Sequence, residues 1–205
     1  MGLYSDVIFP RLYDTWIASP EWQVKREASL AQVRGRTLEI GIGTGLSLDA
    51  YPPEVERIWA VDPNPGMLRQ LAARQGKGRV AVEAECAPAE ALPYPDDSFD
   101  TVACTLVLCS LPDPGAALAE VRRVLRPEGR FLFVEHGLSP DAGVAAWQRR
   151  LNFLQRRLAA GCTLDLEVRR TIASGGFAFD RIEEGYLEGI PKIYGYVTEG
   201  VAVAE

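Results

Sequence analysis

Short apolar runs alternate with amphipathic segments along the middle of the chain. The segments between the runs have helical periodicity, as in the stripe formed by Leu118, Val121 and Leu125. Asp113 is placed to cap that helix. Regular alternation of apolar strands and helices predicts a parallel sheet covered on both faces. The runs have the length of buried strands and lie near residues 36–41, 57–62, 79–84, 99–105 and 129–135.

The two ends of the chain depart from this alternation. Residues 4–34 read as helical, with a break at Ser19-Pro20, and residues 141–160 as one long helix. A shorter helix is expected at about residues 165–174. The apolar side chains that share one side of the long helix are Trp147, Leu151, Leu154 and Leu158. Two closing strands are expected at residues 177–186 and 193–204.

Composition and charge exclude several classes of protein. The 205 residues suffice for one well-buried domain, and 47% of them are hydrophobic. The formal net charge of −6 argues against a nucleic-acid partner, which needs a basic face. The sequence contains neither a secretory signal nor an apolar run long enough to span a membrane, so we expect a cytoplasmic protein. Its cysteines form no C-x-x-C pair and His136 is its only histidine, so no metal site is predicted.

The stretch Leu-Glu-Ile-Gly-Ile-Gly-Thr-Gly at residues 38–45 carries the strongest chemical signal. It leads from a strand towards a helix expected near position 46, and its glycines permit positive φ and close approach to a nucleoside. A dinucleotide fingerprint would place its third glycine at position 46, and Glu39 fits poorly beside a phosphate. The loop therefore predicts a ligand with a nucleoside and no phosphates, which describes S-adenosylmethionine (SAM). Its glycines are Gly41, Gly43 and Gly45.

A second strand ends at Asp62, whose carboxylate can accept hydrogen bonds from both ribose hydroxyls. Asn64 is a candidate N-cap of the following helix, with Pro65 at its first position. Met67, in the first turn of this helix, can pack on an adenine face. The carboxylate and the glycine loop together form a stronger signal than either one alone.

These features resemble the class I SAM-dependent methyltransferases over nearly the whole chain. The segments that carry the resemblance are residues 38–45, 60–68, 89–108 and 117–136. A narrower similarity, to the thiol S-methyltransferases and their bacterial relatives, lies in residues 104–114, 134–137 and 161–164. Some of those relatives are labelled phospholipid or quinone methyltransferases.

The resemblance implies a Rossmann-like α/β fold. Its mostly parallel seven-stranded sheet has the order 3-2-1-4-5-7-6, with the last strand antiparallel and helices on both faces. We expect one domain over residues 1–205, with a helical lid at 1–34, a SAM-binding half at 35–136 and an acceptor-side half at 137–205. Residues 141–160 are expected to join this lid over the carboxyl edge of the sheet, and the alternative is that the N-terminal helices only pack on its flank. The residues expected to bind SAM, or its product S-adenosylhomocysteine, are Glu39, Gly41, Gly43, Gly45, Asp62, Pro63, Met67, Ala89, Glu90, Thr105 and Leu106.

Methyl transfer from a sulfonium requires an aligned nucleophile and a dry site, and no metal or covalent residue. Glu135 and His136 end the fifth strand, beside the place where an acceptor must enter, and are the expected catalytic residues. The imidazole can take a proton from a thiol, a phenol or an ammonium. The alternative is a structural histidine. Glu39 likewise either contacts the donor through water or simply holds the loop.

Aromatic residues outside the alternating core are expected to form the acceptor pocket, although they could equally close the core. Paired arginines at 149–150 and 156–157 share a helix face, which is either solvated or attracts an anionic acceptor or lipid headgroup. Ala160 stands where the thiol methyltransferases tend to have Asp, and Pro88 where many relatives have Asp. The expected substrate-binding residues are Tyr4, Tyr13, Trp147 and Tyr194.

The sequence therefore predicts a SAM-dependent methyltransferase for a small, largely apolar acceptor that reacts through a thiol, hydroxyl or amine. One alternative is a non-catalytic SAM-binding regulator, suggested by the departures at Pro88 and Ala160. Another is a peripheral phospholipid N-methyltransferase, suggested by the paired arginines. The expected partner is a small molecule, with peripheral membrane contact as a further option. The acceptor and the oligomeric state stay open.

Overall fold

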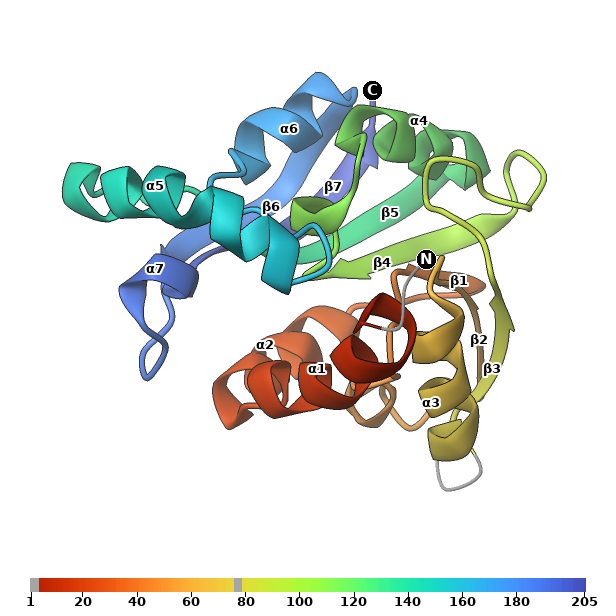
Figure 1. Cartoon of the computed structure of the whole chain (residues 1–205). Helices are drawn as coiled ribbons and strands as arrows, with labels where there is room; N and C mark the ends of the chain where they lie inside the picture. The colour runs from red at the N-terminus through yellow and green to blue at the C-terminus, as the bar shows by residue number, and fades with distance from the viewer. Residues whose placement is uncertain (1–3, 76–78) are drawn as a thin grey trace.

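The computed structural model describes residues 4–75 and 79–205, apart from the side chains at positions 5, 6, 12 and 16. Its centre is one sheet with helices on both faces, α4 and α6 on one side and α1, α2 and α3 on the other (Figure 1). The strand order is β3-β2-β1-β4-β5-β7-β6, as predicted. The strands are β1 (Thr37–Ile40), β2 (Arg57–Val61), β3 (Ala81–Glu85), β4 (Phe99–Thr105), β5 (Leu125–His136), β6 (Phe177–Tyr186) and β7 (Tyr196–Ala204).

The first five strands pair in parallel, and β7 runs antiparallel to both β5 and β6. No helix in the described part of the chain combines the length and the apolarity needed to cross a bilayer. The helices and helical turns are η1 (Tyr4–Ile8), α1 (Phe9–Ile17), α2 (Pro20–Leu30), η2 (Leu48–Ala50), α3 (Pro65–Gln75), η3 (Leu108–Ser110), α4 (Pro114–Val124), α5 (Ala142–Leu158), α6 (Val168–Ser174) and α7 (Lys192–Gly195).

Helix starts follow the capping signals in the sequence. The Asn64 side chain accepts hydrogen bonds from the N–H groups of Gly66 (2.7 Å) and Met67 (3.3 Å), which confirms the predicted cap of α3. Asp113 caps α4 through the N–H of Ala116 at 3.0 Å, also as predicted. Ser19 caps α2 at the expected break between the first two helical segments. These caps fix where each helix leaves the edge of the sheet.

Two expected helices are absent from the described chain. The helix predicted after the glycine loop is only the short turn η2, because Tyr51 is extended ahead of Pro52 and Pro53. No helix joins β3 to β4 either; residues 86–98 form turns and irregular backbone. Prolines interrupt that segment too often for a helix. They are Pro88, Pro93 and Pro95.

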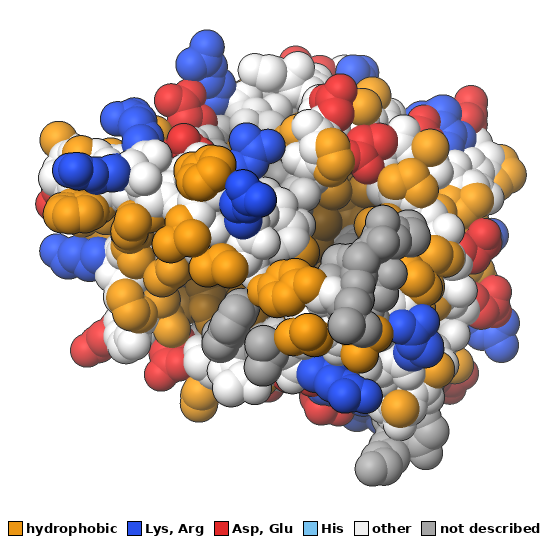
Figure 2. All heavy atoms as spheres, viewed as in Figure 1, with side chains coloured by type: hydrophobic (Ala, Val, Ile, Leu, Met, Phe, Trp, Pro, Cys, Tyr) orange, Lys and Arg blue, Asp and Glu red, His pale blue; other side chains and the backbone are white. Residues whose placement is uncertain are grey.

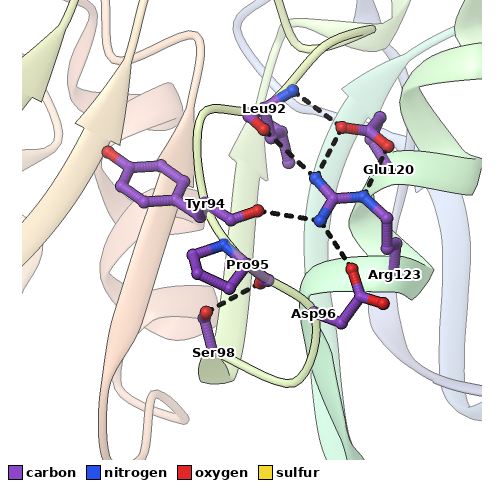
Figure 3. A network of polar contacts seen from close by, with 7 residues as sticks. All are labelled: Leu92, Tyr94, Pro95, Asp96, Ser98, Glu120 and Arg123. Atoms are coloured by element: carbon purple, nitrogen blue, oxygen red, sulfur yellow. Dashed lines mark hydrogen bonds and ion pairs between the residues drawn. The ribbon is translucent and has the colours of Figure 1, made fainter.

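Arg123 on α4 holds this irregular segment in place (Figure 3). Its guanidinium donates to the carbonyl oxygens of Tyr94 (2.8 Å) and Leu92 (3.1 Å), and to the carboxylates of Asp96 and Glu120. Because of these contacts, the pKa of Glu120 lies below its ordinary value. An arginine on the polar side of an amphipathic helix ordinarily faces solvent. Arg123 instead orders the connection that leads away from the expected adenine-binding turn.

Candidate active site

The glycine loop follows β1 and adopts the backbone that only glycine tolerates well. Gly41, Gly43 and Gly45 have φ values of +65°, +58° and +83°, as the turn chemistry predicted. A Cβ at Gly41 would lie 2.5 Å from Val107, and one at Gly45 would lie 2.7 Å from Leu71. A Cβ at Gly43 would meet nothing closer than the Tyr13 ring at 3.7 Å. Gly41 and Gly45 are therefore required because neighbouring side chains pack against them. Gly43 instead leaves open space beneath α1.

Asp62 lies at the carboxyl end of β2, directly beside this loop. Its carboxylate accepts hydrogen bonds from the N–H of Gly43 (2.9 Å) and the N–H of Asn64 (2.8 Å). Burial raises the pKa of Asp62, while the two N–H donors lower it. Each carboxylate oxygen keeps a lone pair beyond these bonds, so the group can still accept hydrogen bonds from a ligand.

Glu39 lies beneath the glycine loop and is almost fully buried. Its Oε2 accepts hydrogen bonds from the hydroxyls of Ser47 and Tyr51, each at 2.9 Å. Burial raises the pKa of Glu39 to about 7, against its ordinary value of 4.5. The contacts are those of an acid that holds the end of the loop, which was one of the two roles expected for it.

The N-terminal helices pack over the carboxyl edge of the sheet. Asp14 on α1 accepts a hydrogen bond from the hydroxyl of Thr44 in the glycine loop and forms an ion pair with Arg74 on α3, both at 2.5 Å. The neighbouring residue, Tyr13, places its ring over Gly43. Helix α1 is thus fastened across the loop.

Arg26, on α2, is a buried charged residue that the sequence analysis did not single out. It is 3% exposed, its Nη2 donates to the carbonyl of Ile17, and its Nη1 has no partner within the described residues. Burial lowers its pKa, and the nearby Tyr13, Glu39 and Asp14 raise it. The available signal was its spacing, because Trp22, Arg26 and Leu30 lie on one face of α2 and that face is buried.

Glu135, at the end of β5, supports the turn that follows β4. Its Oε1 accepts hydrogen bonds from the N–H groups of Val107 (2.7 Å) and Leu108 (2.9 Å) and from the thiol of Cys104 (3.2 Å). Leu106, just before, has a φ of +58°, so the turn is a strained one that needs these contacts. The Oε2 of Glu135 is buried and has no partner in the described chain.

Next to this turn, His136 and two cysteines form a compact group, which we call the Cys–His cluster. His136 Nε2 lies 3.2 Å from the sulfur of Cys162, and that sulfur lies 3.6 Å from the sulfur of Cys109. Hydrogen bonding from Cys109 and from His136 lowers the pKa of Cys162 to about 4. Burial lowers the pKa of His136, but the contact with Cys162 outweighs it and raises that pKa. The cluster therefore favours thiolate and imidazolium charge on this pair.

The chain reaches the cluster through a tight turn after α5. Ala160 and Gly161 have φ values of +48° and +95°, which reverse the backbone. The N–H of Thr163 then donates to the carbonyl of Cys109 at 2.8 Å and brings Cys162 against η3. Asp or Asn tolerates such a φ better than Ala does, so Ala160 is costly at this position.

The remaining expected donor residues lie along the same edge of the sheet. Thr105 and Leu106 are buried at the end of β4, and Met67 is buried in the first turn of α3. Ala89 is buried in the turn after β3. Two residues differ: Pro63 is exposed, and the Glu90 carboxylate accepts the N–H of Asp113 at 3.3 Å.

The expected acceptor residues do not all come together. The Tyr4 hydroxyl donates to the carbonyl of Leu158, which ties η1 to the end of α5. Tyr194 donates to Gln155, whose amide lies 3.7 Å from the Cys162 sulfur, so it reaches the cluster indirectly. Trp147 is 57% exposed on α5 and stacks with Arg150.

Tyr13 links the two parts of the site. Burial raises the pKa of its hydroxyl, the charge of Arg26 lowers it, and the charges of Cys109, Asp62 and Cys162 raise it further. The glycine loop and the Cys–His cluster therefore face one region beneath α1.

Comparison with known proteins shows the family to which the chain belongs. Residues 38–133 match the family described as methyltransferase domain. The human thiol S-methyltransferase TMT1B is 34% identical over 171 residues, which cover 78% of this chain and 70% of the human protein. A phosphatidylethanolamine N-methyltransferase of Cereibacter sphaeroides is 30% identical over 175 residues, which cover 78% of this chain and 85% of that protein.

Solved structures share the fold at lower sequence identity. A SAM-dependent methyltransferase of Thermotoga maritima, described as a possible histamine N-methyltransferase, superposes with a TM-score of 0.70 at 20% identity. The superposition covers 97% of this chain and 99% of the other. With its sheet order and its close relatives, the chain belongs to the class I SAM-dependent methyltransferases.

Proposed function

We propose that this enzyme binds SAM along the carboxyl edge of β1, β2 and β4 and transfers its methyl group to a small, largely apolar thiol. The observation that carries the proposal is the position of Tyr13, whose ring would lie 3.7 Å from a Cβ at Gly43 and whose hydroxyl pKa is raised by the charges of Asp62, Cys109 and Cys162. A donor that lies over the glycine loop would then direct its methyl group towards the cluster.

Each part of the donor has a residue suited to it. Asp62 accepts the ribose hydroxyls through the lone pairs that Gly43 and Asn64 leave available. Arg26 holds the donor carboxylate, because its buried Nη1 has no protein partner in the described chain. The adenine packs against Met67, and Ala89 offers it backbone polar groups. Pro63 and Glu90 lie at its periphery, and Thr105 and Leu106 lie under the methionine moiety.

The acceptor lies against the Cys–His cluster. Its sulfur attacks the methyl carbon in line with the C–S bond of the sulfonium, and that bond breaks to leave neutral S-adenosylhomocysteine. The thiol proton passes to the Cys162 thiolate, which the His136 imidazolium holds by a hydrogen bond, and Glu135 positions the turn beside it. Helix α1, fastened by Asp14, keeps water away from the reacting atoms. A thiol acceptor also matches the name of the human relative.

The test is methyl transfer from labelled SAM to a panel of thiols, phenols, quinols and amines, with calorimetric binding of SAM alongside. We expect thiols with apolar substituents to be methylated first. Transfer to phenols or amines alone would overturn the thiol assignment. SAM binding without transfer to any panel member would favour the non-catalytic regulator. No binding of SAM or S-adenosylhomocysteine at millimolar concentration would overturn the donor site.

A second candidate function is methylation of an acceptor that the enzyme takes from a membrane surface. The exposed face of α5 supports this function. Its large apolar side chains are between 37% and 71% exposed, and Figure 2 shows such side chains gathered with arginines on that side of the molecule. Arg150 and Arg157 lie over the rings of Trp147 and Phe153, each at 5.6 Å. Arginines beside exposed apolar side chains suit an anionic bilayer. The apolar residues are Trp147, Leu151, Phe153, Leu154 and Leu158.

Sedimentation with anionic liposomes at low salt tests this second candidate. We expect the wild-type protein to sediment and the double variant Trp147→Ser, Leu154→Ser to remain in solution. Val24→Ser is the matched control, since Val24 is 62% exposed on α2 and not on α5. Equal sedimentation of all three proteins, or none of the wild type, would contradict a role for α5.

A further inference from the structure

Three side chains with strong metal-ligand character meet in the Cys–His cluster. Cys109 comes from η3, His136 from the end of β5 and Cys162 from the turn after α5. Their ligand atoms all lie within 4.8 Å of one another. His136 and Cys109 are buried and Cys162 is half-buried, so the group is held by packing from three elements.

The spacing of these atoms fits one tetrahedral ion. Zinc binds cysteine sulfur at about 2.3 Å and histidine nitrogen at about 2.0–2.1 Å. Tetrahedral angles then place two sulfurs about 3.8 Å apart and a sulfur and a nitrogen about 3.5 Å apart. The cluster has 3.6 Å between its sulfurs and 3.2 Å between His136 Nε2 and the Cys162 sulfur. Shifts of a few tenths of an ångström would bring these two pairs to the coordination distances, and the third pair, Cys109 and His136, lies within 4.8 Å.

We propose that Cys109, His136 and Cys162 bind a zinc ion whose fourth position is open to the acceptor. Two thiolates and one imidazole are the ligands that zinc prefers, and three protein ligands with one open position are typical of catalytic sites. No metal site was expected from the sequence, because Cys162 lies 26 residues from His136 and 53 from Cys109 and the three form no short motif.

The surroundings of His136 set the expected strength of binding. Coordination through Nε2 leaves the ring proton on Nδ1, which is buried and has no partner in the described chain. Most zinc-bound histidines donate this proton to a carboxylate or carbonyl, and its loss typically weakens binding by about 10- to 100-fold. Zinc here is therefore exchangeable, and the protein must be supplied with it during the test.

The role of the ion rests on the proposed thiol methyl transfer. A thiol that takes the fourth position binds as a thiolate and releases its proton to solvent, so no residue of the cluster need act as a base. The thiolate sulfur then forms a bond to the methyl carbon of SAM while the C–S bond of the sulfonium breaks. The electron pair of that bond stays on the departing sulfur, which gives a thioether and S-adenosylhomocysteine.

Metal titration of the reduced, metal-stripped protein tests the site without reference to activity. We expect one Zn²⁺ per chain in competition with a chromophoric chelator, and the spectrum of tetrahedral thiolate coordination when Co²⁺ replaces it. Cys162→Ser should weaken binding by at least about 100-fold, since a ligand itself is removed. Cys86→Ser is the matched control, because Cys86 is exposed and lies outside the cluster. Cys109→Ser and His136→Asn follow, each checked by thermal unfolding.

The outcomes separate the metal site from the methyl transfer. Absence of stoichiometric zinc in the reduced wild-type protein, or binding that survives both Cys162→Ser and His136→Asn, would overturn the site. Thiol methylation that proceeds in chelator at the zinc-loaded rate would overturn the activating role of the ion. Zinc binding without transfer to any acceptor would instead count against the proposed function.

Discussion

The donor side and the acceptor side of the site are built in different ways. On the donor side, the polar contacts join residues close in sequence: Glu39 bonds to Ser47 and Tyr51, and Gly43 to Asp62 nineteen positions away. On the acceptor side, the contacts of Cys162 with His136 and Cys109 span 26 and 53 positions. The residues of the donor side therefore belong to one local sequence motif. The residues of the acceptor side come together only when segments that are distant in the sequence pack against each other.

The strongest test of this division removes residues 1–18. The cut leaves Ser19, so α2 keeps its N-cap and Trp22 keeps its place in the core. Because α1 covers both sides of the site, we expect methyl transfer to fall to background and SAM binding to weaken while unfolding stays cooperative. Labelled transfer, calorimetry and circular dichroism provide the measurements. Full activity in the shortened protein would mean that α1 merely packs on the molecule.

Asp62→Ala should weaken SAM binding and leave the Cys–His cluster unchanged. Loss of charge-assisted bonds to the ribose should weaken SAM by about 2–3 kcal/mol, or about 30- to 150-fold. Calorimetry checks the affinity, and zinc titration should be unchanged in the same variant. Asp49→Ala serves as the control, because Asp49 is an exposed carboxylate in η2. Unchanged SAM affinity in Asp62→Ala would show that the carboxylate only orders the loop.

Glu39→Gln tests whether a proton on Glu39 stabilises the fold beneath the glycine loop. The pKa of Glu39 is raised from 4.5 to about 7, so the folded state holds its proton more tightly than the unfolded state. Its contribution to stability is therefore fully present below pH 4.5 and is lost as the pH rises through about 7. That loss amounts to about 3 kcal/mol.

Urea unfolding at pH 5 and pH 8 measures this effect. The wild-type free energy of unfolding should fall more steeply with pH than that of Glu39→Gln. Asp62, whose pKa is also raised, is present in both proteins, so the difference between the two curves isolates Glu39. Parallel curves would rule out a proton on Glu39 in this range.

The smallest effect is expected from Arg123→Ala. The variant loses the hydrogen bonds that hold the segment after the adenine-side turn, and we expect a loss of about 1–3 kcal/mol in stability. Thiol acceptor preference should not change, because the segment carries none of the three residues of the Cys–His cluster. Arg170→Ala is the control, since its ion pair with Glu167 is solvent-exposed. Similar losses in both variants would contradict the role of Arg123.

Much of the fold could be predicted from local signals. Asn64 and Asp113 act as caps because a side-chain acceptor one turn before its donor needs no tertiary context. The helix predicted after the glycine loop is absent for a local reason that the sequence also contains, because Pro52 and Pro53 end the helical turn. The strand order followed from the resemblance to a known family and is confirmed.

The acceptor side was less predictable because burial decides it. Trp147 was expected in the pocket on the strength of its aromatic ring, yet its side of α5 is open to solvent. Arg26 was passed over as an ordinary charged residue, although its helical face is buried. The Cys–His cluster depends on the reversal at Ala160 and Gly161, which no periodicity encodes.

Asp14 has a consequence for the rate of turnover. It fastens α1 to Thr44 and to Arg74 at the same time, directly above the glycine loop. If SAM occupies the proposed site, it must enter and its product must leave while both contacts are broken. The rate at which α1 opens would then limit the maximal turnover rate, and this limit would be the same for all reactive acceptors.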